Sequence, residues 1–253
     1  MKLSAPSYRF SSEGEIPSLA LVPPGGDKGH FVRLFLRSPV MDRAGGDPAL
    51  SREFISGDFP VTSSLTAPRQ VHGTEIVTAS KNTSLPQRPS ADGVLLEESG
   101  IEGSLRFADC FPVVLGSNFP APWMALLHSG YKGVVKNIAG QTCSDLFRSR
   151  GAIPSKTWAW IGPGISVSHY FRKKGETWTE KGKSSFSPEN IQESKDAIFF
   201  DLGAQIRTQL LEAGVQDEMI CTIPLCTFRD YDVCYSYRRG DRENRMFLLG
   251  CIK

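Results

Sequence analysis

The stretch that decides the fold is Trp123-Met124-Ala125-Leu126-Leu127-His128-Ser129-Gly130, which leads directly into residues 131–150. Its apolar part is too short for a helix and is typical of a buried strand. Residues 131–150 instead place Val134, Ile138 and Leu146 on one stripe, which predicts an amphipathic helix. A buried strand followed at once by a helix is a building unit of α/β folds.

The rest of the chain has the same texture. Short β-like runs predict strands at residues 31–36, 75–77, 112–115, 158–161 and 219–223. A second helix is predicted from Asp201, a suitable N-cap, to Gly214 at the C-terminal cap. Residues 172–195 are polar and rich in turn formers, so we expect an exposed excursion there. Because no change of composition separates two units, the sequence predicts one α/β domain over residues 1–253.

Composition narrows the class of protein. The 253 residues carry 29 Lys and Arg against 27 Asp and Glu, and a net charge of +2 argues against a nucleic-acid or membrane-surface partner. No apolar run reaches the ~18 residues of a membrane helix, and residues 1–6 lack the apolar core of a secretory signal. The six cysteines form no CxxC pair, which agrees with a reducing compartment. We therefore expect a cytoplasmic protein.

Three residues of metal-ligand or nucleophile type stand where strand-like stretches end: His72, Cys110 and His128. Two imidazoles and a thiolate are the ligands of an open catalytic zinc site, and the same atoms suit copper. Alternatively, Cys110 and one histidine form a thiolate–imidazolium pair that attacks a carbon atom of the substrate. A third interpretation is two hydrogen-bonded core histidines and a buried thiol.

The other histidines and cysteines suggest less chemistry. His30 follows a glycine in a turn-rich segment and is expected at the surface, and His169 is expected only to pack. Cys143, Cys221 and Cys251 are expected to be small buried apolar residues.

The Arg-rich tail is a candidate ligand-binding segment. Residues 229–245 hold five arginines and four acidic residues, too small an excess for nucleic-acid binding. Residues 235–239 alternate like a strand, with Tyr235, Tyr237 and Arg239 on one face. An arginine there can hold a phosphate or carboxylate, or can simply be a charged strand edge.

Several motifs occur in a characteristic order, and together they resemble the YfiH/PgeF family, also called polyphenol oxidoreductase laccase. The resemblance covers Ala67 to the C-terminus and is weak over residues 1–66. The motifs are Gln70-Val71-His72-Gly73, Ala91-Asp92-Gly93, Ala108-Asp109-Cys110-Phe111-Pro112, Leu127-His128-Ser129-Gly130-Tyr131-Lys132-Gly133, Gly162-Pro163-Gly164-Ile165, Asp201-Leu202, Cys226-Thr227 and Tyr235-Ser236-Tyr237-Arg238-Arg239.

The resemblance implies a YfiH-like sandwich, an α/β (α+β) domain of mixed sheets flanked by helices. It also implies a zinc or copper ion held by His72, Cys110 and His128. The implied activity is phosphorolysis of adenosine, inosine and methylthioadenosine, together with adenosine deamination. Asp109 would move a proton or orient a ligand.

Four residues are the candidates for substrate binding under this resemblance: Lys132, Tyr237, Arg238 and Arg239. Lys132 stands where the family usually has arginine, so it keeps the charge and loses the planar fork that holds phosphate.

Three other functions stay open at this stage. One is a hydrolase or amidase acting on cell-wall precursors, with Cys110 as nucleophile and His128 or His72 as base. Another is a copper polyphenol oxidoreductase, which the total of four histidines disfavours. The third is a binding module that has lost catalysis.

Overall fold

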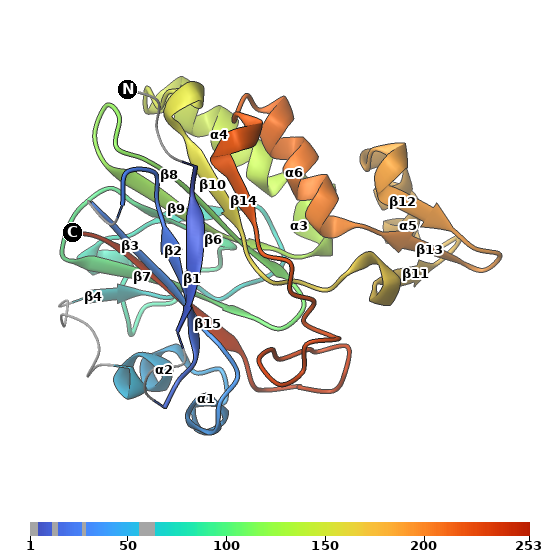
Figure 1. The fold of residues 1–253 in the computed structure, drawn as a ribbon, viewed down its shortest axis with the longest axis horizontal. Coiled ribbons are helices and arrows are strands. Elements are labelled where there is room, and N and C mark those ends of the chain that lie inside the picture. Colours follow the sequence, from blue (N-terminus) through green and yellow to red (C-terminus); the bar gives the residue numbers. More distant parts are fainter. Residues whose placement is uncertain (1–4, 12–14, 27–28, 56–63) are drawn as a thin grey trace.

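Two six-stranded β-sheets form the centre of the molecule (Figure 1). The structure, a computed structural model, describes residues 5–11, 15–26, 29–55 and 64–253. The prediction that residues 1–6 lack a secretory signal therefore falls partly outside the described residues, because residues 1–4 are not among them. The first sheet has the order β1 (Ser7–Ser11), β2 (Ser18–Val22), β3 (His30–Phe35), β15 (Met246–Ile252), β7 (Ile101–Phe107), β4 (Ser64–Thr66). The second has the order β14 (Ile220–Thr222), β10 (Trp158–Ile161), β8 (Phe111–Ser117), β9 (Trp123–Ser129), β6 (Gly93–Leu96), β5 (Ile76–Thr78).

The two sheets pack face to face. Val94 and Leu126 of the second sheet lie against the backbone of Gly103 and Gly250 of the first, and both side chains are fully buried. Most neighbouring strands are antiparallel, whereas β4 with β7, β5 with β6, and β10 with β14 are parallel. The predicted sandwich of mixed sheets is confirmed.

Helices cover the outer face of the second sheet. The helices α3 (Tyr131–Val135) and α4 (Ile138–Ser149) pack on β9, and α6 (Leu202–Glu212) packs on β10 (Figure 1). The helix α6 begins and ends as predicted, because the Asp201 side chain accepts the Ala204 N–H and Gly214 has a φ of 99°. Two short helices, α1 (Pro39–Ala44) and α2 (Pro48–Phe54), follow β3. No helix in the described ranges is long and apolar enough to cross a membrane.

The predicted single helix over residues 131–150 is wrong. Asn137 interrupts it with a left-handed φ of 61°, and its side chain accepts the Gly140 N–H to begin α4. Residues 172–195 are mostly exposed as predicted, although Thr179, Phe186 and Asn190 are buried, and they are more regular than expected. They contribute to a third sheet, β11 (Phe171–Lys173), β13 (Ala197–Phe200) and β12 (Ile191–Glu193), and include α5 (Thr177–Ser185).

Two further predictions need correction. His30 is buried rather than at the surface, because its Nε2 lies 3.0 Å from the Trp123 carbonyl oxygen and its ring packs edge-on against Trp158. Residues 235–239 are not a strand, because residues 235–236 are irregular and residues 237–240 form a turn. The Asp241 carboxylate holds this turn by accepting the Ser236 N–H and the Arg239 guanidinium.

The remaining predictions concern minor residues. Cys143 is fully buried, whereas Cys221 and Cys251 are half-buried. His169 packs as expected, with its ring stacked on Phe228 at 4.4 Å between centroids.

Candidate active site

Three connections between the two sheets meet at one end of the sandwich. The segment from β4 to β5 carries His72, the tight turn from β7 to β8 carries Cys110, and the long return from β14 to β15 carries Tyr237 and Arg238. The paired strands β8 and β9 place Pro112 opposite His128 and so bring the β9 histidine beside Cys110. The sheet crossings therefore gather residues that are far apart in the sequence.

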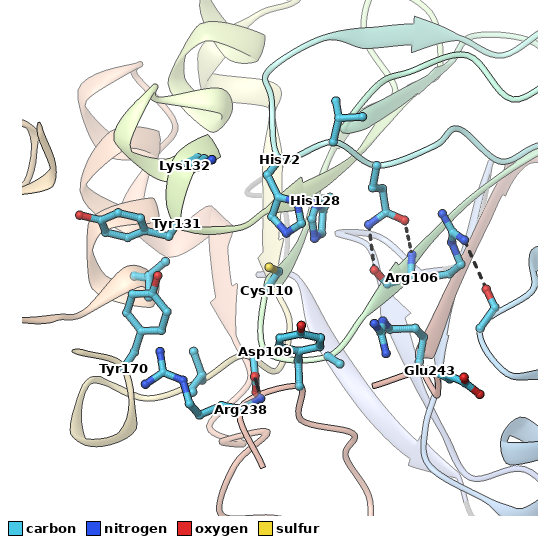
Figure 2. A pocket seen from close by; sticks show the side chains of 18 of the residues that line it. His72, Arg106, Asp109, Cys110, His128, Tyr131, Lys132, Tyr170, Arg238 and Glu243 are labelled. Carbon is cyan, nitrogen blue, oxygen red and sulfur yellow. Dashed lines mark hydrogen bonds between the residues drawn. The ribbon is translucent and has the colours of Figure 1, made fainter. Parts of the chain in front are cut away.

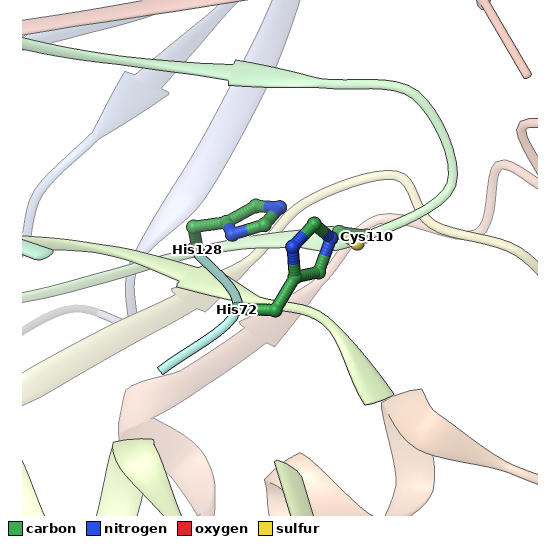
Figure 3. Close-up of side chains that lie close together, drawn as sticks. All are labelled: His72, Cys110 and His128. Carbon is green, nitrogen blue, oxygen red and sulfur yellow. The ribbon is translucent and has the colours of Figure 1, made fainter. Parts of the chain in front are cut away.

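His72, Cys110 and His128 form a cluster (Figure 3). One ligand atom from each residue lies within 4.8 Å of the other two. The two imidazole rings meet edge to face with 4.9 Å between centroids. His128 is buried, Cys110 is half-buried and His72 is exposed, so the cluster has one closed side and one open side.

Asp92 positions both histidines of the cluster. Its buried carboxylate accepts the backbone N–H groups of Val71, His72 and Gly73 at 3.1, 2.9 and 2.6 Å. These bonds hold His72 at a φ of 60°, a conformation that non-glycine residues adopt only under constraint. The same carboxylate lies 2.8 Å from Nδ1 of His128, which leaves Nε2 of that ring free for a ligand.

Charges within the cluster shift the pKa values of Cys110 and His128. Burial opposes ionisation of Cys110, but the charge of His128 and hydrogen bonds from His128 and His72 lower the pKa of the thiol to about 6. Burial likewise opposes the charged form of His128, yet the Cys110 thiolate and the Asp92 carboxylate raise the pKa of its imidazole to about 9. The thiolate is the form that binds metal or attacks carbon.

The backbone around the cluster fits a metal ion held by three protein ligands. A Cβ atom at Gly130 would lie 2.7 Å from Sγ of Cys110 and 2.9 Å from Cδ2 of His72, so only glycine leaves these ligands in place. Two imidazoles, one thiolate and an open side are the donor set of a catalytic zinc site with a fourth position for substrate or water. His72, Cys110 and His128 therefore fit a zinc ion.

A cavity of about 750 Å³ opens beside the cluster (Figure 2). In Figure 2 the cluster lies between Tyr131 and Tyr170 on one side and Arg106 on the other. The aromatic side has Tyr131 and Tyr170 with ring centroids 5.5 Å apart. Four predicted residues besides the cluster line the cavity: Asp109, Lys132, Tyr237 and Arg238.

Two predicted residues have contacts that bear on their roles. Asp109 accepts the Thr227 hydroxyl at 2.8 Å and the Arg238 N–H at 2.7 Å, so its carboxylate ties the β14–β15 connection to the turn that carries Cys110. Arg239 does not line the cavity. Its guanidinium donates to the carbonyl oxygens of Thr227, Phe228 and Cys234 and to the Asp241 carboxylate.

Sequence reasoning missed several residues of the cavity wall. These residues are Gln70, Arg106, Tyr131, Tyr170, Arg172, Glu243 and Arg245. Tyr131 and Gln70 belong to quoted motifs and could have been considered for this reason. Glu243 and Arg245 belong to the Arg-rich tail, which was a candidate segment as a whole without either residue being singled out. Nothing in the local sequence distinguishes Arg106, Tyr170 and Arg172 from surface or core residues.

Comparison with known proteins shows the family to which the chain belongs. Residues 50–253 match the family described as multi-copper polyphenol oxidoreductase laccase. The chain belongs to this family. The predicted resemblance to the YfiH/PgeF family is confirmed, and the match begins before Ala67, where the predicted resemblance begins.

Relatives of this laccase-family chain carry the name purine nucleoside phosphorylase. One from Xylella fastidiosa is 27% identical over 197 residues, which cover 73% of this chain and 70% of the relative. The purine nucleoside phosphorylase YlmD of Geobacillus stearothermophilus is 31% identical over 198 residues, covering 72% and 69%.

Solved structures extend the likeness to nearly the whole chain. The crystal structure of YlmD from Geobacillus stearothermophilus superposes with a TM-score of 0.81 at 24% identity, covering 98% of this chain and 100% of that one. The hypothetical protein YfiH of Bacillus licheniformis also gives 0.81, at 17% identity, covering 96% and 99%. The N-terminal strands thus belong to the shared fold.

Proposed function

We propose that this protein is a metal-dependent purine nucleoside phosphorylase that takes adenosine, inosine and methylthioadenosine, with adenosine deamination as a second activity. The observation that carries the proposal is the cluster of His72, Cys110 and His128 on the wall of a cavity with aromatic and cationic sides. The names of the relatives support the same substrate class.

Zinc is the proposed metal, with copper as the alternative, and His72, Cys110 and His128 would hold it. When bound, zinc supplies a Lewis acid that polarises an oxygen atom of the substrate or of water. The Asp92 carboxylate keeps His128 in one tautomer and orientation before any ligand arrives.

The cavity walls suit a nucleoside. The rings of Tyr131 and Tyr170 offer a face on which a purine can stack, and Tyr237, Lys132 and Arg238 offer polar contacts around it. In phosphorolysis a phosphate oxygen bonds to C1′ of the ribose while the bond from C1′ to the purine nitrogen breaks. The purine leaves with the electron pair and takes a proton from solvent. Asp109 accepts the backbone N–H of Arg238 and so ties Arg238 to the turn that carries Cys110.

The test combines metal analysis with product analysis. Wild-type protein purified without added metal is expected to hold about one zinc or copper per chain and to convert adenosine to adenine only when phosphate is present. Inosine and ammonia formed without phosphate report deamination separately. His128→Ala and Cys110→Ala should lose both metal and turnover, whereas Cys221→Ala, outside the cavity, should keep both. Full metal content and normal turnover in His128→Ala would refute the proposal.

A second candidate function is a metal-free hydrolase acting on amide-bearing cell-wall precursors. The observation that favours it is the contact of Cys110 with His72 and His128, whose ligand atoms lie within 4.8 Å of one another. This contact lowers the pKa of the thiol to about 6 and favours the nucleophilic thiolate at neutral pH. It predicts turnover that survives chelators and is abolished by alkylation of Cys110. Turnover lost to chelators and restored by zinc would exclude it.

A further inference from the structure

Two arginines of the cavity wall are the side chains that the proposed function has not used. Arg106 lies near the end of β7, and Arg245 directly precedes β15. These strands are hydrogen-bonded neighbours, with Met246 opposite Phe107. Both arginines line the cavity. Arg106 lies on the side of the cluster that faces away from Tyr131 and Tyr170 (Figure 2).

Neither guanidinium is paired with a carboxylate. Arg106 donates to the carbonyl oxygens of Gly46 at 3.3 Å and Pro68 at 3.2 Å. Arg245 donates to the carbonyl oxygens of Asp241, Arg242 and Asn244 at 3.2, 2.8 and 2.7 Å. Within the part of the chain that the structure describes, no ion pair involves either side chain.

This arrangement leaves two positive charges without a direct carboxylate partner in a half-buried place. Asp47 attracts Arg106, and Asp109 and Asp241 attract Arg245, only across longer distances. Burial, together with the charges of Arg88 and Arg245, lowers the pKa of Arg106 to about 10. Burial also lowers the pKa of Arg245. Two half-buried like charges that are held by carbonyl oxygens and line the same cavity form a site that an anion stabilises.

The other cations of the cavity lie over aromatic rings, and Arg245 also lies 5.9 Å from the ring centroid of Tyr237. The Nζ of Lys132, an exposed residue, lies 5.1 Å from the ring centroid of Trp178. Arg238 lies over the rings of Tyr170 and Phe171 at 5.3 and 5.2 Å. These cations belong to the aromatic side, where a base would stack, and not to the side of Arg106.

We infer that Arg106 and Arg245 form an oxyanion subsite that binds the inorganic phosphate used in phosphorolysis. The inference rests on the proposed function for the identity of the anion, and on the structure for the site. It places phosphate on one side of the metal cluster and the purine on the other. The ribose C1′ then lies between them, as an attack opposite to the leaving purine requires.

The backbone around the subsite is built closely. Gly46, with a φ of 72°, supplies the carbonyl oxygen that Arg106 contacts, and a Cβ atom there would lie 2.7 Å from the Glu243 carbonyl oxygen. The side-chain amide of Gln70 bonds to the backbone N–H and carbonyl of Arg106 at 3.0 and 2.8 Å. The guanidinium can therefore be removed while the β7 backbone keeps its support.

The test is direct binding of inorganic phosphate to the metal-loaded full chain by isothermal titration calorimetry. Arg245→Gln and Arg106→Gln are each expected to weaken phosphate binding about 10- to 100-fold, the effect of losing a charged hydrogen-bond donor. Arg245→Lys, which keeps the charge without the fork, should fall between wild type and Arg245→Gln. Arg150→Gln, an exposed arginine paired with Glu97, is the matched control and should bind like wild type.

The outcomes separate the inference from the proposed function. Phosphate binding that is equal in wild type and both glutamine variants, or absent in wild type, overturns the subsite. Binding of a carboxylate such as acetate in preference to phosphate also overturns it. If phosphate binds and the variants weaken it, but no nucleoside is consumed, the subsite stands and the proposed function fails. If nucleosides are consumed with an unchanged KM for phosphate in Arg245→Gln, the function stands and the subsite is wrong.

Discussion

Replacing Gly130 with alanine tests the proposed metal site without changing any of its three ligand residues. Gly130 has φ of −79° and ψ of 169°, values that alanine adopts without strain. Its new Cβ would lie 2.7 Å from the Cys110 sulfur and 2.9 Å from the His72 ring. Carbon atoms pack at ~3.5–4.0 Å, so the two ligands must withdraw by about 1 Å. Because metal–ligand distances tolerate only ~0.2 Å, we expect zinc affinity to fall about 100-fold or more.

The assay is competition for zinc with a chromophoric chelator, run beside thermal unfolding of the metal-free protein. Overpacking at Gly130 should cost about 1–3 kcal/mol of unfolding free energy, so the variant should still fold. Gly203→Ala is the control. It lies in the first turn of α6, and the three atoms nearest to its Cβ would belong to Phe111, at 3.2 Å, and Asp201, not to a cluster ligand. A folded Gly130→Ala protein with wild-type zinc affinity would refute the close packing on which the site depends.

Three more predictions follow from the same contacts. Asp92→Asn should weaken zinc binding about 10- to 100-fold in the chelator assay, because the neutral amide holds His128 and the backbone of His72 less firmly; unchanged affinity would show that the carboxylate has no positioning role. In metal-free protein, alkylation of Cys110 should accelerate as the pH rises through about 6, where the thiolate forms, while Cys143, whose pKa burial raises to about 12, stays unlabelled in mass spectra; acceleration only above pH 8 would contradict the thiolate. Removing the metal should lower the unfolding free energy by about 2.7 kcal/mol relative to protein with free zinc at 100 times its Kd, measured by denaturant titration; equal stability with and without zinc would argue against binding to the native state.

The cluster is the part of the site that the sequence predicts best. Each of His72, Cys110 and His128 follows or ends a strand-like run, and strand ends meet at a common edge of a sheet. The short apolar strands and the helix α6 with its two caps could also be predicted from the sequence. Apolar runs and capping residues are both local signals.

The sequence did not predict which residues are brought together by the pairing of distant strands. Arg106 and Arg245 become neighbours only because β7 pairs with β15, and nothing local announces that pairing. Asn137 breaks a helix whose apolar stripe continues across the break, so periodicity alone hides it. His30 follows a turn-rich segment, yet it is the first residue of β3 and lies between the sheets. There the Trp123 carbonyl oxygen accepts a hydrogen bond from the Nε2–H of its ring.

The central position of β15 has a consequence for biosynthesis. This strand separates β3 from β7 in the first sheet, and its residues emerge from the ribosome after those of both neighbours. Until then β3 and β7 each present an unpaired edge, the kind of surface on which chains aggregate. A premature stop or a proteolytic cut before Met246 leaves both edges permanently open. Such a product should be cleared or precipitate rather than persist as a slightly shortened enzyme.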